Sequence, residues 1–234
     1  MSLIEIKKEI EKSADPEKAR ILQGFFKTGK GEYGEGDIFR GIKVPIERQI
    51  AKKYPSLSLK DIQSLLESKY HEERMIALLI LIFKYSKSSD YNKAEIFNFY
   101  IKNTKYINNW DLVDLSCHKI IGDYLLKKDR SILYKLVKSN SLWEKRISII
   151  STFAFIKHDD FADSLRLAEI LLNDKHDLIH KAVGWTLREI GKKDISVLEN
   201  FLKQHYKVMP RTALRYSIER LPEKQRKAYL NGEV

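Results

Sequence analysis

The sequence predicts an all-α protein built from stacked pairs of helices, and three observations support this. Apolar residues recur with a helical period along nearly the whole chain, and no segment shows the alternation of a β-strand. Only 10 glycines and 5 prolines occur among 234 residues, which is too few for a fold rich in tight turns. The links between the predicted helices are short and polar, which places sequential helices antiparallel.

The first helices begin at recognisable signals. Residues 3–10 carry a short amphipathic pattern. Asp15 precedes a proline, so it is a typical N-cap residue, and the helix that follows is expected to run to about Phe26. A third helix is predicted to begin at Pro45, and a fourth to follow the potential N-cap Ser58.

From residue 71 onward the helices follow a regular period. The predicted spans are 71–86, 90–104, 109–127, 130–139, 141–156, 159–173, 176–192, 194–206 and 210–220. In pairs they repeat every ~35–40 residues, the size of a HEAT-type repeat. Similar phrases recur in 73–78, 144–149 and 180–185. Because such repeats stack into a curved solenoid, we expect one domain over residues 1–234 with a basic concave groove.

Composition excludes several classes of protein. An apolar content of 43% is too high for a disordered chain. The single Cys117 excludes a disulfide framework within one chain and any site with several thiolates. The longest apolar run, residues 75–83, is far shorter than the roughly 20 residues of a membrane span. The N-terminus has no apolar signal core, so we expect a soluble, cytoplasmic monomer that does not bind membranes.

The glycine-rich stretch 27–44 is the one long irregular segment. Gly24 and Gly29–Lys30 nearly match a P-loop, which is a phosphate-binding motif. A helix precedes the motif where a strand is required, and glycine follows Lys30 where Ser or Thr should bind Mg²⁺. We therefore interpret the segment as a flexible basic loop.

His176 and His180 have the spacing of metal ligands on one helix. No third ligand is evident near them, and an exposed helix start explains both residues. The sequence therefore predicts no metal site and no cofactor.

The net charge of +11, from 43 Lys and Arg against 32 Asp and Glu, favours a polyanionic partner without identifying it. An ordinary basic protein would share this charge. Eight of the basic residues lie between 203 and 227, and three of them recur four residues apart: Lys207, Arg211 and Arg215. We interpret these three as a track for phosphates, although a solvated helix face has the same pattern.

Each of the three tryptophans has a charged neighbour on its own helix face. The pairs are Trp110 with Asp114, Trp143 with Arg146, and Trp185 with Lys181 and Arg188. Indole faces can contact sugars, bases or cations, and the basic residues can hold phosphates. A carboxylate among cations weakens DNA binding, so Asp114 in such a groove would need a chemical role, such as stabilising a developing positive charge on a sugar. Tryptophans that only fill the core would fit the same pattern.

Several blocks together resemble the AlkD family of DNA alkylation repair glycosylases. They occur in the family's order and cover most of the chain: 15–19, 41–45, 109–114 with 122–125, 142–146, and 181–189. The resemblance implies an array of HEAT-like repeats around duplex DNA that contains alkylated bases. It also implies excision of N3- and N7-alkylpurines in base excision repair without base flipping and without a cofactor.

The resemblance also implies roles for individual residues. Asp114 would be the catalytic carboxylate that stabilises an oxocarbenium-like sugar and orients water. The other contacts would be Trp110 and Trp185 to the deoxyribose and DNA backbone, Arg146 to phosphate with support from Lys181 and Arg188, and Phe25 or Phe26 to the lesion.

Two other functions remain open at this point. The chain could be a non-catalytic binder of duplex or branched DNA on the same scaffold. It could also be a HEAT-type scaffold for protein interactions, with its tryptophans in the core. Exposure of Asp114 and of the indole faces distinguishes the glycosylase from the scaffold.

Overall fold

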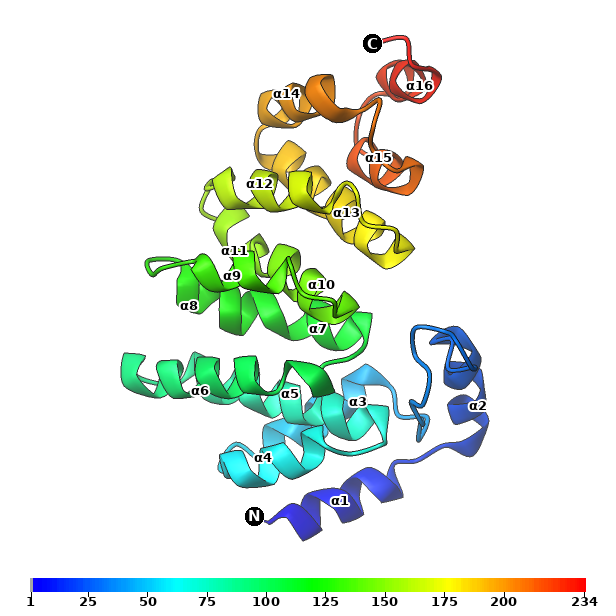
Figure 1. Ribbon diagram of the computed structural model, residues 1–234. Coiled ribbons are helices and arrows are strands. Elements are labelled where there is room, and N and C mark those ends of the chain that lie inside the picture. Colours follow the sequence, from blue (N-terminus) through cyan, green and yellow to red (C-terminus); the bar gives the residue numbers. More distant parts are fainter. Residues whose placement is uncertain (1) are drawn as a thin grey trace. The chain divides into compact units, whose positions relative to one another are not determined.

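The structure is a computed structural model that describes residues 2–234. Over this range it contains only helices, turns and one isolated bridge between Ile38 and Tyr70 (Figure 1). The predicted all-α helical-repeat fold is confirmed. The chain divides into two compact units, Met1–Ser116 and Cys117–Val234, which are described separately below. The single domain over 1–234 stays a prediction.

The N-terminal unit is organised around one long helix. Its elements are α1 (Leu3–Lys12), α2 (Pro16–Phe25), α3 (Val44–Lys53), α4 (Leu59–Leu66), α5 (His71–Ser86), α6 (Asp90–Lys102), the 3-10 turn η1 (Thr104–Tyr106), and α7 (Trp110–Cys117) up to Ser116. Every residue of α5 from His71 to Leu81 is buried, and α3 and α4 pack against this helix. The apolar run seen in the sequence is therefore the core of this unit, where each buried Leu or Ile contributes about 1.5–3 kcal/mol.

The C-terminal unit is built in the same manner around α13. Its elements are the π-helical turn η2 (His118–Gly122), α8 (Asp123–Leu125), α9 (Ser131–Leu136), α10 (Leu142–Ser151), α11 (Phe153–Ile156), α12 (Ala162–Leu171), α13 (Asp177–Lys193), α14 (Ile195–His205), α15 (Arg211–Ser217) and α16 (Glu223–Asn231). Helix α13 packs against α10, α12, α14 and α15. The three recurring phrases of the sequence fall on α5, α10 and α13, so the repeat follows the helices that form the core of each unit.

Helix starts agree with the sequence where a capping residue is present. Asp15 accepts a hydrogen bond from the Lys18 amide at 3.1 Å, and Ser58 accepts one from the Asp61 amide at 3.1 Å. Helix α16 lies beyond the last predicted helix. Its only fully buried residue is Tyr229, which leaves too weak an apolar period to recognise.

The glycine-rich segment has a defined path, although it was expected to be flexible. The Gly34 amide donates to the Lys27 carbonyl at 3.1 Å, which closes the base of the loop below its tip, residues 28–33. Ile38 then pairs with the chain just before α5, and the His71 amide donates to the Ile38 carbonyl at 2.9 Å.

The amide groups that a phosphate would need in this loop are already occupied by carboxylates. Glu32 accepts from the Gly29 amide and Glu35 from the Gly31 amide, both at 2.8 Å. A helix, α2, also precedes the loop. These contacts agree with the interpretation that the glycine motif is not a P-loop.

The loop enters α3 through a close backbone contact at Gly41. This residue has φ +83°, and a Cβ atom there would lie 2.1 Å from the Asp15 carbonyl oxygen, so only glycine fits. The Glu72 carboxylate accepts the amide hydrogens of Arg40, Gly41 and Ile42 at 2.8–3.2 Å. One carboxylate on α5 thus fixes the end of the loop.

Candidate functional site

Four aromatic rings of the N-terminal unit form a cluster that contains both phenylalanines singled out in the sequence. Phe26 stacks between Phe39 and Trp110, with ring centroids 4.8 and 5.4 Å away. Phe25 lies edge-on to Trp110 at 6.2 Å. Phe26 is buried, with 6% of its surface exposed, whereas 62% of the Phe25 surface is exposed. Of the two candidates, Phe25 is therefore the one available for a lesion contact.

Asp114 lies one helical turn after Trp110 on α7, so both side chains occupy one face of the helix. Asp114 and Trp110 are each half-buried. The structure thus keeps this carboxylate and this indole adjacent, and neither residue is sequestered in the core.

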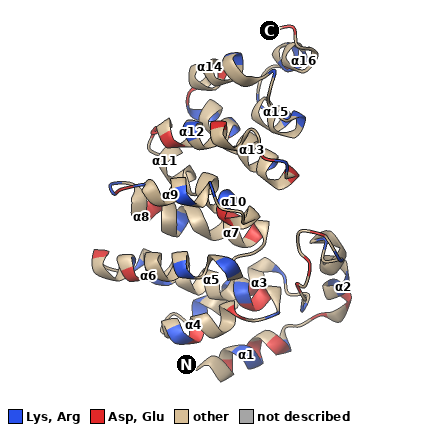
Figure 2. Ribbon diagram, viewed as in Figure 1, with Lys and Arg blue, Asp and Glu red and all other residues tan. Residues whose placement is uncertain are grey.

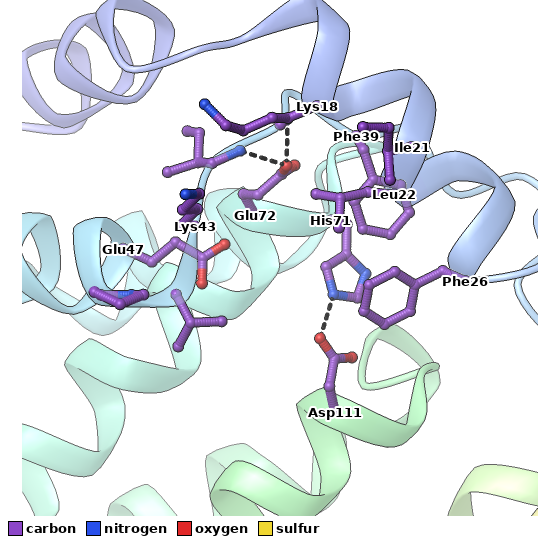
Figure 3. A pocket seen from close by; sticks show the side chains of 14 residues that line it. Lys18, Ile21, Leu22, Phe26, Phe39, Lys43, Glu47, His71, Glu72 and Asp111 are labelled. Carbon is purple, nitrogen blue, oxygen red and sulfur yellow. Dashed lines mark hydrogen bonds and ion pairs between the residues drawn. The ribbon is translucent and has the colours of Figure 1, made fainter.

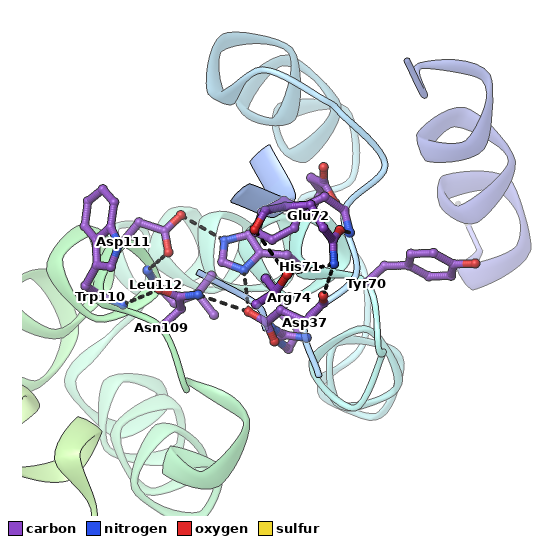
Figure 4. A network of polar contacts seen from close by, with 12 residues as sticks. Asp37, Tyr70, His71, Glu72, Arg74, Asn109, Trp110, Asp111 and Leu112 are labelled. Atoms are coloured by element: carbon purple, nitrogen blue, oxygen red, sulfur yellow. Dashed lines mark hydrogen bonds and ion pairs between the residues drawn. The ribbon is translucent and has the colours of Figure 1, made fainter. Parts of the chain in front are cut away.

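A buried polar network fixes the start of α7 (Figure 4). His71 contacts the Asp37 carboxylate through Nδ1 at 3.1 Å and the Asp111 carboxylate through Nε2 at 2.8 Å. The Arg74 guanidinium donates to the second oxygen of Asp37 at 2.6 Å. Two carboxylates, an imidazolium and a guanidinium balance in charge, which a buried cluster requires.

Asn109 connects this network to the aromatic cluster. Its Nδ2 donates to Asp37 at 3.0 Å, and its Oδ1 accepts the amide hydrogen of Trp110 at 2.8 Å. Asp111 in turn accepts the Leu112 amide hydrogen at 2.9 Å. The network therefore holds the first turn of the helix that carries Trp110 and Asp114.

The charges in this network shift the pKa values of its members. Burial lowers the pKa of His71, but Asp111 and Asp37 outweigh this effect and raise it to about 9. Burial alone would raise the pKa of Asp37, but His71, Arg74 and Asn109 lower it below its usual value. His71 is therefore an imidazolium at neutral pH and donates through both nitrogens.

The free energy of unfolding should fall as pH rises through the pKa of His71. The folded-state pKa of about 9 exceeds the 6.5 of an unperturbed histidine, so this contribution is complete below pH 6.5 and is lost as pH rises through about 9. We expect a loss of up to about 3 kcal/mol. Urea unfolding of wild type and His71→Gln between pH 6 and 9.5 measures it. Plotted against pH, the free energy of unfolding should fall more steeply for wild type than for His71→Gln. Parallel plots would contradict the charged state of His71.

In the C-terminal unit, Trp185 is held by two neighbours. Its indole Nε1 donates to Glu189 Oε1 at 3.0 Å, and Phe153 packs edge-on to its ring at 4.7 Å. The indole is half-buried. It is therefore oriented by a hydrogen bond and by packing, while part of its surface stays accessible.

The basic residues near Trp185 have partners within the protein. The buried Arg146 donates to the Leu178 carbonyl through Nη1. Lys181 pairs with Asp177 at 2.7 Å, and Arg188 pairs with Glu219. A phosphate at these positions would compete with acidic side chains for Lys181 and Arg188.

The C-terminal basic residues are exposed but do not share one helix. Arg211 and Arg215 lie four residues apart on α15, whereas Lys207 lies in the turn that precedes it. Of the three residues interpreted as a phosphate track, only Arg211 and Arg215 therefore share a helix face. Figure 2 shows Lys and Arg interspersed with Asp and Glu along the helices of both units.

The two spaced histidines of α13 serve as local structure. His176 Nδ1 accepts the Leu178 amide hydrogen at 3.1 Å, and His180 Nε2 contacts the Asp174 carbonyl at 2.6 Å. Within residues 2–234 no three His, Cys, Asp or Glu side chains are grouped as metal ligands. Over the same range, no helix has the length and apolar content needed to cross a bilayer.

Sequence reasoning did not identify the network around Asp37. Its hydrogen bonds join residues up to 72 positions apart, and Asp37 stands in a segment interpreted as flexible. One signal was available: His71 and Arg74 immediately precede the longest apolar run, where they must be buried and therefore paired.

Comparison with known proteins gives a consistent assignment of family. The sequence model of the family described as DNA alkylation repair enzyme matches residues 6–221. No curated protein sequence matches the chain.

Two solved structures share the fold. A protein from Enterococcus faecalis described as a predicted DNA alkylation repair enzyme is 17% identical, with a TM-score of 0.70 over 90% of this chain and 98% of the other. AlkD2 from Streptococcus mutans is also 17% identical, with a TM-score of 0.56 over 88% of this chain and 98% of the other. At this level of identity, the two structures establish the fold alone.

Proposed function

Because the chain belongs to the family of DNA alkylation repair enzymes, we propose that it is a glycosylase that hydrolyses the N-glycosidic bond of N3- and N7-alkylated purines in duplex DNA. The observation that carries this proposal is the position of Asp114. A half-buried carboxylate lies one turn from Trp110, on a helix whose start is fixed by a buried ionic network. A residue placed in this way can act on a sugar that contacts the indole.

The chemistry demands little of the protein beyond this carboxylate. Alkylation at N3 or N7 makes the base cationic, so the electrons of the C1′–N bond leave with the base and neutralise it. The sugar becomes oxocarbenium-like, and Asp114 stabilises its positive charge. Asp114 also orients the water that attacks C1′, and this water gives up one proton to the solvent as the new C1′–O bond forms. The leaving base needs no general acid, and the base stays in the duplex rather than entering a pocket.

The other candidate residues would bind DNA. In the N-terminal unit, Trp110 offers aromatic surface to the deoxyribose and the exposed Phe25 offers its ring to the lesion. Trp185 offers a second indole in the C-terminal unit, with Lys181 and Arg188 as phosphate contacts. Arg146 would have to leave its buried position at the Leu178 carbonyl to contact a phosphate. Because acidic partners already hold Lys181 and Arg188, part of the binding energy would be spent on exchanging these partners.

Release of N7-methylguanine from duplex DNA tests the proposal. We expect the chain to release the base well above the rate of spontaneous depurination, at saturating protein and in single turnover. Binding of the same duplex without release above that rate would identify a non-catalytic DNA binder. Absence of binding would favour the protein-interaction scaffold.

Binding of duplex DNA should weaken steeply with salt, because phosphate contacts release counterions. Each contact contributes a slope of about −0.9 to log K against log[salt]. Arg211→Gln with Arg215→Gln should make the slope shallower by up to about 2, because both side chains are exposed on α15. Fluorescence anisotropy between 50 and 300 mM KCl measures it. The charge-matched control pair is Lys52→Gln on α3 with Lys60→Gln on α4. Equal salt slopes for the two double variants would contradict phosphate binding by Arg211 and Arg215.

A further inference from the structure

The N-terminal unit contains a cavity of about 430 Å³ that is separate from Trp110 and Asp114 in its lining. It lies between α2, the end of the glycine-rich loop, α3 and α5 (Figure 3). Its walls are almost entirely carbon and come from Ile21, Leu22, Phe26, Phe39, Ile42 and Val44. A volume of this size suits a small ligand with one or two rings.

One polar group points into this apolar space without a partner. The Glu47 side chain on α3 is 2% exposed, and its Oε2 has no hydrogen-bond partner among residues 2–234. Figure 3 shows its carboxyl group directed into the cavity. Burial raises the pKa of Glu47 well above its usual value. A buried carboxyl group without a partner is costly, so this residue is an anomaly in an otherwise satisfied wall.

The other two acids of the cavity are satisfied by the protein. Glu72 receives amide hydrogens from Arg40, Gly41 and Ile42, and Asp111 receives a hydrogen bond from His71. At the rim, Lys18 is paired with Asp15. Within the described lining of the cavity, Glu47 is therefore the acid that is open to a ligand.

We propose that this cavity binds a compact aromatic cation of the arylamidine or arylmethylamine class, with its ring against the apolar walls and its N–H groups donating to the Glu47 carboxylate. The ring accounts for the carbon lining, and the cationic nitrogen accounts for the unpartnered oxygen. The inference uses none of the residues assigned to base release.

Ligand entry is compatible with the way in which α2 is held. All ten residues of α2 are described, and none of them is fully buried. Ile21 and Val44, at the rim of the cavity, are exposed. The wall formed by α2 can therefore adjust around a ligand at a smaller cost than a wall made from a core helix.

The preference for a cation rests on the Glu47 carboxylate itself, because the charges around it nearly cancel. Glu72 on α5 and Asp111 on α7 add negative potential, which His71 on α5 and Arg48 on α3 oppose. Lys18 on α2 and Lys43, just before α3, also line the cavity and add positive charge. When the cation binds, the Glu47 carboxyl group gives up its proton to solvent and forms an ion pair with the ligand. Below the pKa of Glu47, binding should therefore release up to one proton and should tighten as pH rises.

Benzamidine and its neutral isostere benzamide test the site. Titration calorimetry at pH 6 should show one benzamidine per chain, bound at least about tenfold more tightly than benzamide, since a charge-assisted hydrogen bond contributes about this factor. Proton release is measured by repeating the titration in buffers of different ionisation enthalpy. Methyl NMR shifts should be confined to the cavity walls, at Ile21, Leu22, Ile42 and Val44. Equal affinity for both probes, or shifts elsewhere, would overturn the proposal.

Two variants separate ligand binding from folding. Glu47→Gln should remove the preference for benzamidine and the proton release, while the matched control Glu95→Gln, an exposed acid on α6, should keep both. Glu47→Met should abolish benzamidine binding and raise Tm by about 3 °C at pH 8, because an unpartnered carboxyl group is removed from an apolar wall. Benzamidine bound with wild-type affinity by either folded Glu47 variant would refute the assignment. Base release from alkylated DNA should be the same in all three variants, so it tests the glycosylase proposal independently.

Discussion

Replacing Asp114 by asparagine should reduce the release of N7-methylguanine from duplex DNA by at least about 100-fold, the loss typical when one electrostatic stabiliser of a transition state is removed. Asparagine keeps the size of the side chain and its hydrogen-bonding ability, but not its negative charge. The oxocarbenium-like sugar would then form without its counter-charge. Single-turnover release of the base, measured at saturating protein, reports this step directly.

Two controls make the result specific to Asp114. Asp90→Asn, an exposed acid on α6, should release the base at the wild-type rate. Affinity of Asp114→Asn for the duplex should be unchanged or slightly higher, because a carboxylate repels phosphates. A wild-type rate for Asp114→Asn would assign the chemistry to another residue, whereas a fall in affinity alone would assign Asp114 to binding.

Replacing Asp37 by alanine should cost about 3–5 kcal/mol of unfolding free energy, which is the usual effect of breaking a buried ion pair. Asp37 is 4% exposed and accepts hydrogen bonds from Arg74, His71 and Asn109. Its removal leaves two buried cations with a single remaining carboxylate, that of Asp111. Urea unfolding followed by circular dichroism measures the loss.

The matched control for Asp37 is Asp90→Ala, which should change the free energy of unfolding by less than about 0.5 kcal/mol because the side chain is exposed. An equal effect of both substitutions would mean that the network contributes no more than surface charges do. Asp37→Asn should fall between the two, because it keeps the bond from Arg74 but removes the charge.

The fold could be predicted because its determinants are local in sequence. Asp15 and Ser58 cap their own helices, and the apolar period along 71–86 defines the helix that is buried there. Helix α16 escaped prediction because one buried tyrosine does not make a period. The signals that failed are those in which packing against the rest of the chain decides the outcome.

The candidate site could be predicted only in part, for the same reason. Trp110 and Asp114 are four residues apart, so their shared face follows from helix geometry. The contacts of Asp37 span 34 to 72 residues, and no local pattern connects these positions. The exposure that separates Phe25 from Phe26 also depends on Phe39, which reaches Phe26 from the far end of the loop.

The closed base of the glycine-rich loop makes its tip a natural entry point for protein engineering. Lys27 and Gly34 are joined by a backbone hydrogen bond, and Gln23 bonds to the Asp37 carbonyl at 2.7 Å, so the chain is already clamped where the tip begins and ends. The entropy of closing a loop grows only with the logarithm of its length, and each doubling adds about 0.6 kcal/mol. An epitope tag or a fluorophore-binding peptide inserted between Gly29 and Gly31 would therefore leave the helices on either side folded.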